Sequence, residues 1–271
     1  MTSIRIGFVS RGDINSVKMV RDLVEKFRSR AEIFVEPQLA TKLGLKETSI
    51  EEMDVDFIVS VGGDGTILRT IQKMKDPHPI LGINMGTLGF LVDVDPKDAV
   101  RILEHVIFGF EVVERNRLEI KVNGDSISCA TNEVALLSAS PAKMLEFEIS
   151  VDDSLLESLR ADGLLFATAT GSTAYAMSAG GPIVDPRVDA VVLVPMAPFK
   201  LSARPWVLSE DSVIRVELLL PGKKALVVVD GQNVATISNR DKVVISKAEK
   251  PARFVKTSKN GFYEKVKSKL A

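Results

Sequence analysis

A buried strand that runs directly into a glycine-rich turn is the feature that most constrains this fold. Residues 55–61 are mostly apolar and lead into Gly62-Gly63-Asp64-Gly65-Thr66, after which helical spacing resumes at residues 67–71. A strand, a glycine turn and a helix in this order are typical of a parallel α/β sheet, in which anions bind at helix N-termini. The segment therefore predicts an α/β domain with a phosphate loop at the end of a central strand.

The rest of residues 1–110 supports an α/β domain with a parallel sheet. Strand and helix patterns alternate through this half of the chain, as expected for a doubly wound sheet. The expected strands cover residues 4–9, 33–35, 55–61 and 79–84, and the expected helices cover about 15–29, a stretch from 67 and a stretch after Asp95-Pro96.

The pattern changes after Gly109. Residues 111–249 hold short alternating runs separated by Asp, Gly and Pro, and Asn123-Gly124 is a typical hairpin turn. One helix is expected near Ser172. This half therefore predicts a β-rich, sandwich-like antiparallel domain. The tail, residues 250–271, carries a short amphipathic helix that we expect to pack back on the first domain.

The composition argues against several classes of protein. The chain of 271 residues has 35 Lys and Arg against 36 Asp and Glu, so its net charge of −1 argues against a nucleic-acid binder. One cysteine and two histidines argue against a disulfide framework and a structural zinc site, and favour a cytoplasmic home. No apolar run reaches the roughly 18 residues of a spanning helix, so no membrane partner is expected. The N-terminus enters a strand directly, which predicts no signal peptide.

The glycine loop suits a phosphate because glycines let an anion approach without meeting a Cβ. It matches neither the Walker loop nor the dinucleotide fingerprint. Asp64 is unusual there, since a carboxylate repels phosphate unless it accepts a proton or holds magnesium. The alternative is a tight strand–helix turn in which Asp64 caps the helix. Arg69, one turn later, either reaches a phosphate or lies on a solvated helix face.

A second glycine-rich turn, residues 82–90, follows the next expected strand. Loops at the carboxyl ends of parallel strands meet at one edge of the sheet, where ligands bind. We therefore expect the two turns to form one cleft.

Polar clusters in the second half suggest a nucleotide pocket. Asn132-Glu133 offers donors and acceptors suited to sugar hydroxyls, although alone it is a common surface dipeptide. In residues 160–181 an apolar strand ends in small and hydroxyl residues, Tyr175 offers a stacking face and Asp162 an acceptor for an amine. The alternative is a Ser/Thr-capped helix with Tyr175 in the core. Asp230-Gly231-Gln232 is by pattern a hairpin turn.

Four motifs in this order resemble those of the NAD kinase family. They are Gly62-Gly63-Asp64-Gly65-Thr66, Asn132-Glu133, the stretch from Asp162 through Thr170-Gly171-Ser172-Thr173-Ala174-Tyr175 to Ser178, and Asp230-Gly231-Gln232. The first is shared with 6-phosphofructokinases and diacylglycerol kinases, whereas the third is far more specific. The resemblance covers essentially the whole chain, and it implies an N-terminal α/β domain followed by a β-sandwich.

The resemblance implies that ATP, or another phosphate donor such as polyphosphate, phosphorylates the adenosine ribose 2′-hydroxyl of NAD to give NADP. Asp64 would accept the proton, Gly62, Gly63 and Thr66 would complete the phosphate loop, and magnesium would arrive with the nucleotide rather than on a protein site. The implied binding residues are Gly65, Arg69, Asn132, Glu133, Lys143, Arg160, Asp162, Thr170, Thr173, Ala174, Tyr175, Ser178, Ala197 and Gln232. The family also implies a homodimer or homotetramer.

The sequence departs from the family pattern at two positions, and two alternative functions are considered. Ala169 stands where many members have proline and Phe199 where many have histidine, which leaves the substrate details around Ala197 open. A lipid or sugar kinase would share the glycine loop, and a non-enzymatic NAD sensor would keep the pocket. The Asn-Glu pair and the 170–175 stretch argue against the first, and Asp64 argues against the second, because a pure binder gains nothing from that carboxylate.

Overall fold

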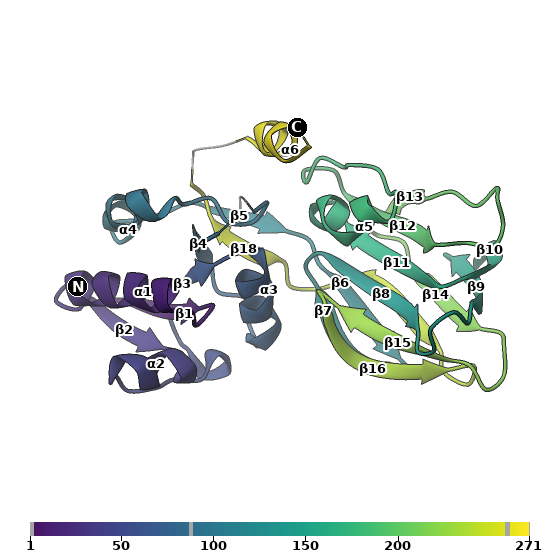
Figure 1. The fold of residues 1–271 in the computed structure, drawn as a ribbon, viewed down its shortest axis with the longest axis horizontal. Helices are drawn as coiled ribbons and strands as arrows, with labels where there is room; N and C mark the ends of the chain where they lie inside the picture. Colours follow the sequence, from purple (N-terminus) through teal and green to yellow (C-terminus); the bar gives the residue numbers. More distant parts are fainter. Residues whose placement is uncertain (1–2, 87–88, 258–260, 271) are drawn as a thin grey trace. The chain divides into compact units, whose positions relative to one another are not determined.

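The structure, a computed structural model, describes residues 3–86, 89–257 and 261–270. The chain divides into two compact units (Figure 1). Unit 1 comprises Met1–Glu114 and Ala252–Ala271, and unit 2 comprises Arg115–Pro251. The domains expected from the sequence were residues 1–110 with the tail, and residues 111–249.

Unit 1 is an α/β structure. Its strands are β1 (Ile4–Ser10), β2 (Ala31–Val35), β3 (Phe57–Gly62), β4 (Ile80–Asn84), β5 (Val112–Arg115) and β18 (Ala252–Val255). Its helices are α1 (Ile14–Phe27), α2 (Pro37–Leu43), α3 (Asp64–Lys73), α4 (Ala99–Val106) and α6 (Phe262–Leu270), with 3₁₀ turns η1 (Ile50–Glu52) and η2 (Pro96–Asp98). None of the helices in the described ranges is long and apolar enough to cross a membrane.

The six strands of unit 1 form one sheet in the order β2-β1-β3-β4-β18-β5. The pairs β1–β2, β1–β3, β3–β4 and β4–β18 are parallel, which confirms the expected parallel sheet. Successive side chains of a strand point to opposite faces. Phe8 and Val59 pack with Leu23 of α1, whereas Val9 and Ile58 pack with Ile67 of α3. Helices therefore cover both faces, and the sheet is doubly wound.

Unit 2 is built from two antiparallel sheets. Its strands are β6 (Leu118–Val122), β7 (Asp125–Ala130), β8 (Glu133–Ser138), β9 (Leu145–Val151), β10 (Ser154–Ala161), β11 (Gly163–Thr168), β12 (Ala190–Met196), β13 (Trp206–Ser209), β14 (Ile214–Leu218), β15 (Lys224–Val229), β16 (Gln232–Ser238) and β17 (Val243–Lys247). One sheet has the order β10-β9-β14-β17-β6-β7. The other has the order β13-β12-β11-β8-β15-β16 (Figure 1). The expected β-rich sandwich is confirmed.

The core of unit 2 lies between these sheets. Phe147 of β9 and Phe166 of β11 are fully buried in one cluster that contains residues of both sheets. The other face of the β11 sheet is covered by η3 (Thr170–Thr173) and α5 (Tyr175–Ser178), and Ala176 packs there with Leu165. Every residue of β11 is buried, because both of its faces are covered. The sequence predicted one helix near Ser172; the structure has these two short elements.

Candidate functional site

The carboxyl ends of β1 and β3 define the site in unit 1. From β1 the chain crosses to β2 on one side, and it then returns to β3 on the other side of β1. The direction of winding therefore reverses between β1 and β3. Open α/β sheets bind ligands at such a switch point, just beyond the carboxyl ends of the strands. The two loops there are residues 10–13 and the glycine loop.

The glycine loop turns tightly from β3 into α3. A Cβ on Gly62 would lie 2.3 Å from Thr66 Oγ1, so glycine is required at this position by close packing. Gly63 is the N-cap of α3 and makes no side-chain capping bond, and the helix itself begins at Asp64. The first-turn N–H groups of a helix attract anions. The predicted loop residues Gly62, Gly63, Gly65 and Thr66 thus lie together at this helix start.

The carboxylate of Asp64 contacts the loop that follows β4. Oδ2 accepts a hydrogen bond from the N–H of Phe90 at 2.7 Å, and Oδ1 accepts from Leu91 at 3.0 Å and Val92 at 3.1 Å. A Cβ on Gly89 would lie 2.0 Å from Oδ1, so this approach also requires glycine. Asp64 therefore does not cap its helix; instead it joins the two glycine-rich turns. Thr87 and Leu88 of the second turn lie outside the described residues.

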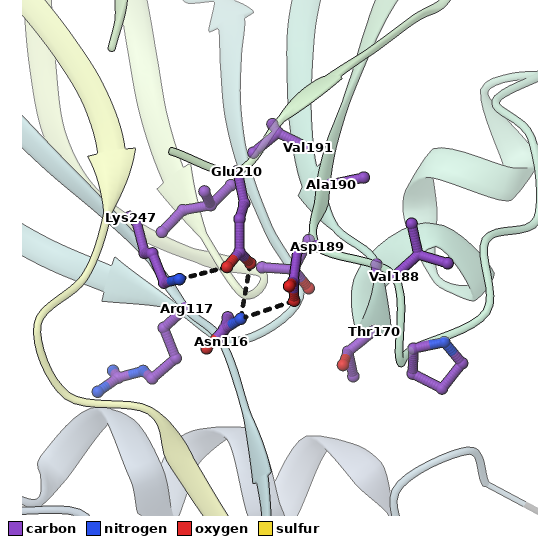
Figure 2. Close-up of a pocket in the computed structure, with 13 residues that line it drawn as sticks. Asn116, Arg117, Thr170, Val188, Asp189, Ala190, Val191, Glu210 and Lys247 are labelled. Atoms are coloured by element: carbon purple, nitrogen blue, oxygen red, sulfur yellow. Dashed lines mark hydrogen bonds and ion pairs between the residues drawn. The ribbon is translucent and has the colours of Figure 1, made fainter. Parts of the chain in front are cut away.

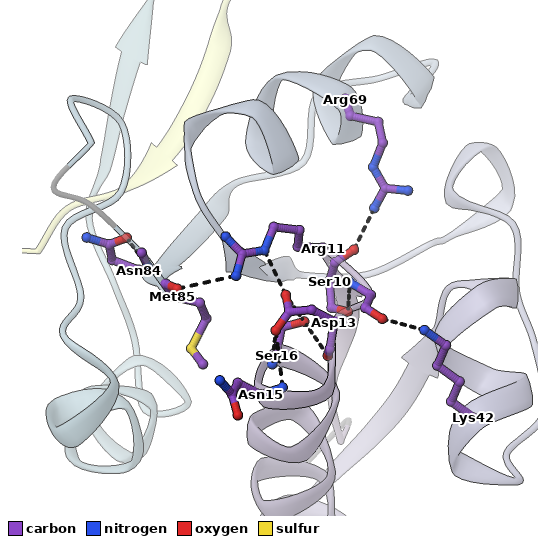
Figure 3. A network of polar contacts seen from close by, with 11 residues as sticks. Ser10, Arg11, Asp13, Asn15, Ser16, Lys42, Arg69, Asn84 and Met85 are labelled. Atoms are coloured by element: carbon purple, nitrogen blue, oxygen red, sulfur yellow. Dashed lines mark hydrogen bonds and ion pairs between the residues drawn. The ribbon is translucent and has the colours of Figure 1, made fainter.

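Arg69 lies against the end of β1 (Figure 3). Its Nη2 donates to the carbonyl oxygen of Ser10 at 2.9 Å and to the carboxylate of Glu36 at 3.0 Å. Glu36 is 3% exposed and also accepts from the N–H of Ser10 at 2.7 Å. Arg69 is thus an anchor for the loop after β1, and its predicted contact with a phosphate stays a prediction. Nothing local in the sequence marked Glu36, because its partners are 26 and 33 residues away.

Arg11 is a site residue that the sequence reasoning missed. It follows β1, its N–H donates to the carbonyl oxygen of Val61 at 3.0 Å, and its Nη2 donates to Met85 O at 3.4 Å (Figure 3). Its guanidinium therefore lies among the loops after β1, β3 and β4. The Arg11 guanidinium is paired with Asp13 and holds the pKa of that carboxyl well below its usual range. The sequence feature that could have indicated Arg11 is its position beside Gly12, directly after the first strand.

In unit 2, the Asn132-Glu133 pair is held by a single carboxylate. Asp230 Oδ1 accepts from the N–H groups of Asn132 at 2.8 Å and Glu133 at 3.1 Å, and Oδ2 accepts from Thr131 at 2.9 Å. Asp230 begins the β15–β16 turn with φ +46°, and Gly231 follows with φ +79°. Two positive φ values in succession are typical of a tight hairpin. The hairpin expected at Asp230-Gly231 therefore also fixes the backbone of the Asn-Glu pair.

The side chain of Glu133 is buried and only partly satisfied. It accepts a hydrogen bond from the backbone N–H of Tyr175, whereas Oε2 has no hydrogen-bond partner among the described residues. Burial and, secondly, the negative charge of Asp230 raise the pKa of Glu133 to about 7. A buried polar atom without a partner is unfavourable in a protein alone. Oε2 is therefore suited to contact a ligand hydroxyl.

The 168–178 segment packs tightly on the Asn-Glu pair. A Cβ on Gly171 would lie 2.0 Å from Asn132 O, and the Thr168 N–H donates to the same oxygen at 2.9 Å. Tyr175 is 43% exposed at the start of α5, so it is not the core residue of the alternative interpretation. The predicted residues at this end of β11 are Asn132, Glu133, Thr170, Thr173, Ala174, Tyr175 and Ser178, with Gln232 opening β16.

Other predicted binding residues lie toward the opposite end of β11. Asp162 directly precedes that strand, and its N–H donates to Met196 O at 3.0 Å, next to Ala197. Arg160 stacks over the Phe199 ring at 5.9 Å, and Lys143 is exposed in the loop before β9.

The N–H of Tyr175 bonds to Glu133, which pairs with Ala167 near the other end of β11. Asp162 and Ala167 are five residues apart, which at about 3.3 Å per residue separates them by roughly 16 Å. The structure therefore does not bring Asp162 close to the backbone N–H of Tyr175.

A small polar pocket lies beside Thr170 (Figure 2). Asn116 Nδ2 donates to Glu210 Oε2 at 2.6 Å and to Asp189 Oδ1 at 3.4 Å, and Lys247 forms an ion pair with Glu210. The Asn116–Asp189 contact joins the start of β6 to the segment before β12, and the Lys247–Glu210 ion pair joins the end of β17 to the residue after β13. These polar side chains are paired with one another, and we assign the cluster a structural role.

Comparison with known proteins identifies both halves of the chain. Residues 17–109 match the family model described as the ATP-NAD kinase N-terminal domain, and residues 131–257 match the ATP-NAD kinase C-terminal domain. The NAD kinase of Methanosarcina mazei is 54% identical over 98% of this chain and 94% of that protein. The NAD kinase of Methanothermobacter thermautotrophicus is 50% identical over 98% and 96%.

Solved structures agree with this. The NAD kinase from Archaeoglobus fulgidus in complex with ATP matches with a TM-score of 0.82 at 36% identity, over 98% of this chain and 99% of that chain. Yeast NADH kinase complexed with NADH matches with a TM-score of 0.91 at 24% identity, over 98% and 87%, which shows the shared fold. The matches in sequence and in structure run through both units, and the chain belongs to the ATP-NAD kinase family.

Proposed function

We propose that the chain transfers the terminal phosphoryl group of ATP to the adenosine ribose 2′-hydroxyl of NAD, giving NADP and ADP. That it is an enzyme that phosphorylates NAD follows from family membership and 54% identity to a NAD kinase over nearly its full length. A lipid or sugar kinase and a non-enzymatic NAD sensor are not favoured. The position of the hydroxyl, the donor and the roles of individual residues are the finer parts of the proposal.

The single observation that carries these roles is the position of Asp64. Its carboxylate is the acidic group inside the glycine loop, at the start of α3 and at the switch point of the sheet. In phosphoryl transfer the enzyme mainly positions the reactants and neutralises charge. The 2′-hydroxyl oxygen forms the new bond to phosphorus as the bond to ADP breaks, and Asp64 takes the hydroxyl proton. An ionised carboxylate can accept about four hydrogen bonds. The backbone N–H groups of Phe90, Leu91 and Val92 occupy three of these positions on Asp64, which leaves one for the hydroxyl.

The remaining assignments in unit 1 follow from position. Gly62, Gly63, Gly65 and Thr66 form the loop that would hold the donor phosphates at the start of α3, and Arg11 adds a positive charge beside it. Magnesium, which binds oxygen ligands and is commonly held by substrate phosphates, would be carried by the phosphate oxygens of the nucleotide. Magnesium on the nucleotide would supply neutralisation of the phosphate charge.

The remaining assignments in unit 2 concern NAD. Asn132 and Glu133 would bind sugar hydroxyls, since Glu133 Oε2 is buried without a partner in the described part of the chain. Thr170, Thr173, Ala174, Tyr175 and Ser178 would surround the adenine. Lys143, Arg160, Asp162, Ala197 and Gln232 stay predictions as binding residues, as do a cytoplasmic location and a homodimer or homotetramer.

The direct test is incubation with NAD, magnesium and one donor at a time, followed by enzymatic detection of NADP. We expect NADP with ATP, and the comparison with other nucleotides and polyphosphate identifies the donor. Digestion of the product with a 3′-nucleotidase tests the position of the new phosphate, and we expect the product to resist it. A product labile to that enzyme would contradict the 2′ assignment.

A further inference from the structure

The loop after β4 connects Asp64 to the C-terminal helix. Its residues 90–92 donate three N–H groups to the carboxylate of Asp64. On its other side the same loop is contacted by α6, more than 170 residues later in the sequence. All of these residues belong to unit 1.

Lys265 makes the main contact from α6. Only 6% of this lysine is exposed, and its Nζ donates to the carbonyl oxygen of Phe90 at 3.0 Å and pairs with the carboxylate of Asp93. Asp93 also accepts from Thr257 Oγ1 at 3.2 Å. The ammonium of Lys269 lies 4.1 Å from the centre of the Phe90 ring. A buried lysine is unfavourable unless it is paired and hydrogen-bonded, so this position is specified by its partners.

One peptide group links the lysine to Asp64. The carbonyl of Phe90 accepts from Lys265, and the N–H of Leu91, which belongs to the same planar peptide unit, donates to Asp64 Oδ1 at 3.0 Å. A cation on the carbonyl polarises the peptide and strengthens its N–H as a donor, and hydrogen bonds in such a chain reinforce each other. The plane of this peptide therefore fixes Asp64 at one end and Lys265 at the other.

We propose that Lys265 is a positioning residue for Asp64: through the Phe90–Leu91 peptide, the C-terminal helix holds the carboxylate in the geometry that the reaction needs. The inference rests on the proposed role of Asp64 as proton acceptor. Because proton acceptance acts in the transition state, loss of Lys265 should affect turnover rather than NAD binding.

The test is steady-state kinetics of the full chain with NAD, ATP and magnesium. Lys265→Met keeps the volume of the side chain and removes its charge. We expect kcat to fall at least about tenfold, a part of the 10²–10⁴-fold scale of general-base catalysis, with KM for NAD within about twofold of wild type. Lys265→Arg should recover most of the loss. Lys267→Met, at an exposed lysine of the same helix, should leave kcat unchanged.

Two further variants separate the explanations. In Lys265→Met combined with Asp93→Asn no unpaired carboxylate is left behind, and kcat should stay low; recovery to wild type would assign the loss to Asp93 and overturn the proposal. A kcat for Lys265→Met within twofold of wild type, in protein shown to be folded by its thermal transition, would also overturn it. Asp64→Asn is the reference variant. If Asp64→Asn keeps its turnover, the proposed role of Asp64 as proton acceptor is wrong. If Asp64→Asn loses turnover but Lys265→Met does not, only the link between Lys265 and Asp64 is refuted.

Discussion

Glu133 is a single residue whose charge should make stability depend on pH. Its pKa is raised to about 7 from 4.5 by burial and by Asp230, so the folded state keeps a proton that the unfolded state loses. Stability therefore falls as pH rises from 4.5 to about 7, because the folded state binds more protons in that window. Above this pH window, the raised pKa of Glu133 lowers the free energy of unfolding by roughly 3 kcal/mol relative to its value below the window.

Glu133→Gln should remove this dependence. Between about pH 5 and pH 8 we expect the variant to gain roughly 2–3 kcal/mol relative to wild type, measured by urea unfolding at both pH values. Other titrating groups act equally in both proteins, so the comparison isolates Glu133. An equal difference at the two pH values would contradict the raised pKa.

Tyr175 is an exposed aromatic residue beside the Asn-Glu pair. If it stacks on adenine, Tyr175→Ala should raise KM for NAD by the equivalent of about 1–3 kcal/mol and change kcat little, since stacking acts on ground and transition states alike. Tyr263→Ala, at an exposed tyrosine of unit 1, is the matched control for KM. An unchanged KM in Tyr175→Ala would place adenine elsewhere.

At the scale of elements, the β15–β16 turn supports the start of β8. Asp230→Ala would leave three backbone N–H groups without their acceptor, those of Thr131, Asn132 and Glu133. We expect it to lower the free energy of unfolding by roughly 2–4 kcal/mol. Asp153→Ala removes an exposed aspartate that also has a positive φ, 65°, and should change stability far less. Similar losses in the two variants would argue against the role of Asp230.

The sequence predicted most of the inner strands and missed the edge strands of unit 2. The strands at β1, β3, β4 and β11 are apolar runs, because they are covered on both faces. The runs expected as strands in unit 2 were 118–122, 145–151, 163–168, 190–195, 212–220, 225–230 and 242–246, so β7, β10, β13 and β16, the four edges of its two sheets, were missed. The inner strands β8 and β18 and the edge strand β5 were also not assigned. An edge strand has one neighbour and mostly exposed side chains, so its hydrophobic pattern is weak. β10 also carries an irregular register between Leu155 and Glu157.

The site could be predicted only in part for a related reason. Motifs such as the glycine loop and Asn132-Glu133 are contiguous, so their residue types were visible in the sequence. The partners of Asp64 lie 26–28 residues away, and Asp230 lies 97–99 residues from the N–H groups that it accepts from. Local patterns do not encode such contacts. Glu36 and Lys265 were missed because their contacts depend on tertiary packing, whereas Arg11, beside Gly12 after the first strand, could have been noticed in the sequence.

At the scale of the whole molecule, we expect assembly into a homodimer or homotetramer. Phe199 and Leu201 lie in the loop before the edge strand β13, and together with Val207 on that strand they are largely exposed apolar residues of unit 2. Exposed apolar groups beside an unpaired strand edge favour association. Light scattering at micromolar concentration should give a multiple of 29.5 kDa. A mass of one chain would contradict this expectation.

In the proposed function, unit 1 would provide the phosphate loop and Asp64, and unit 2 would provide the residues for NAD. The most direct measurement compares wild type with Asp64→Asn for NADP formation and, by calorimetry, for NAD binding. We expect NAD affinity to change little and turnover to fall by about 10² or more, because a neutral amide cannot accept the hydroxyl proton. Turnover within tenfold of wild type would show that Asp64 is not the proton acceptor.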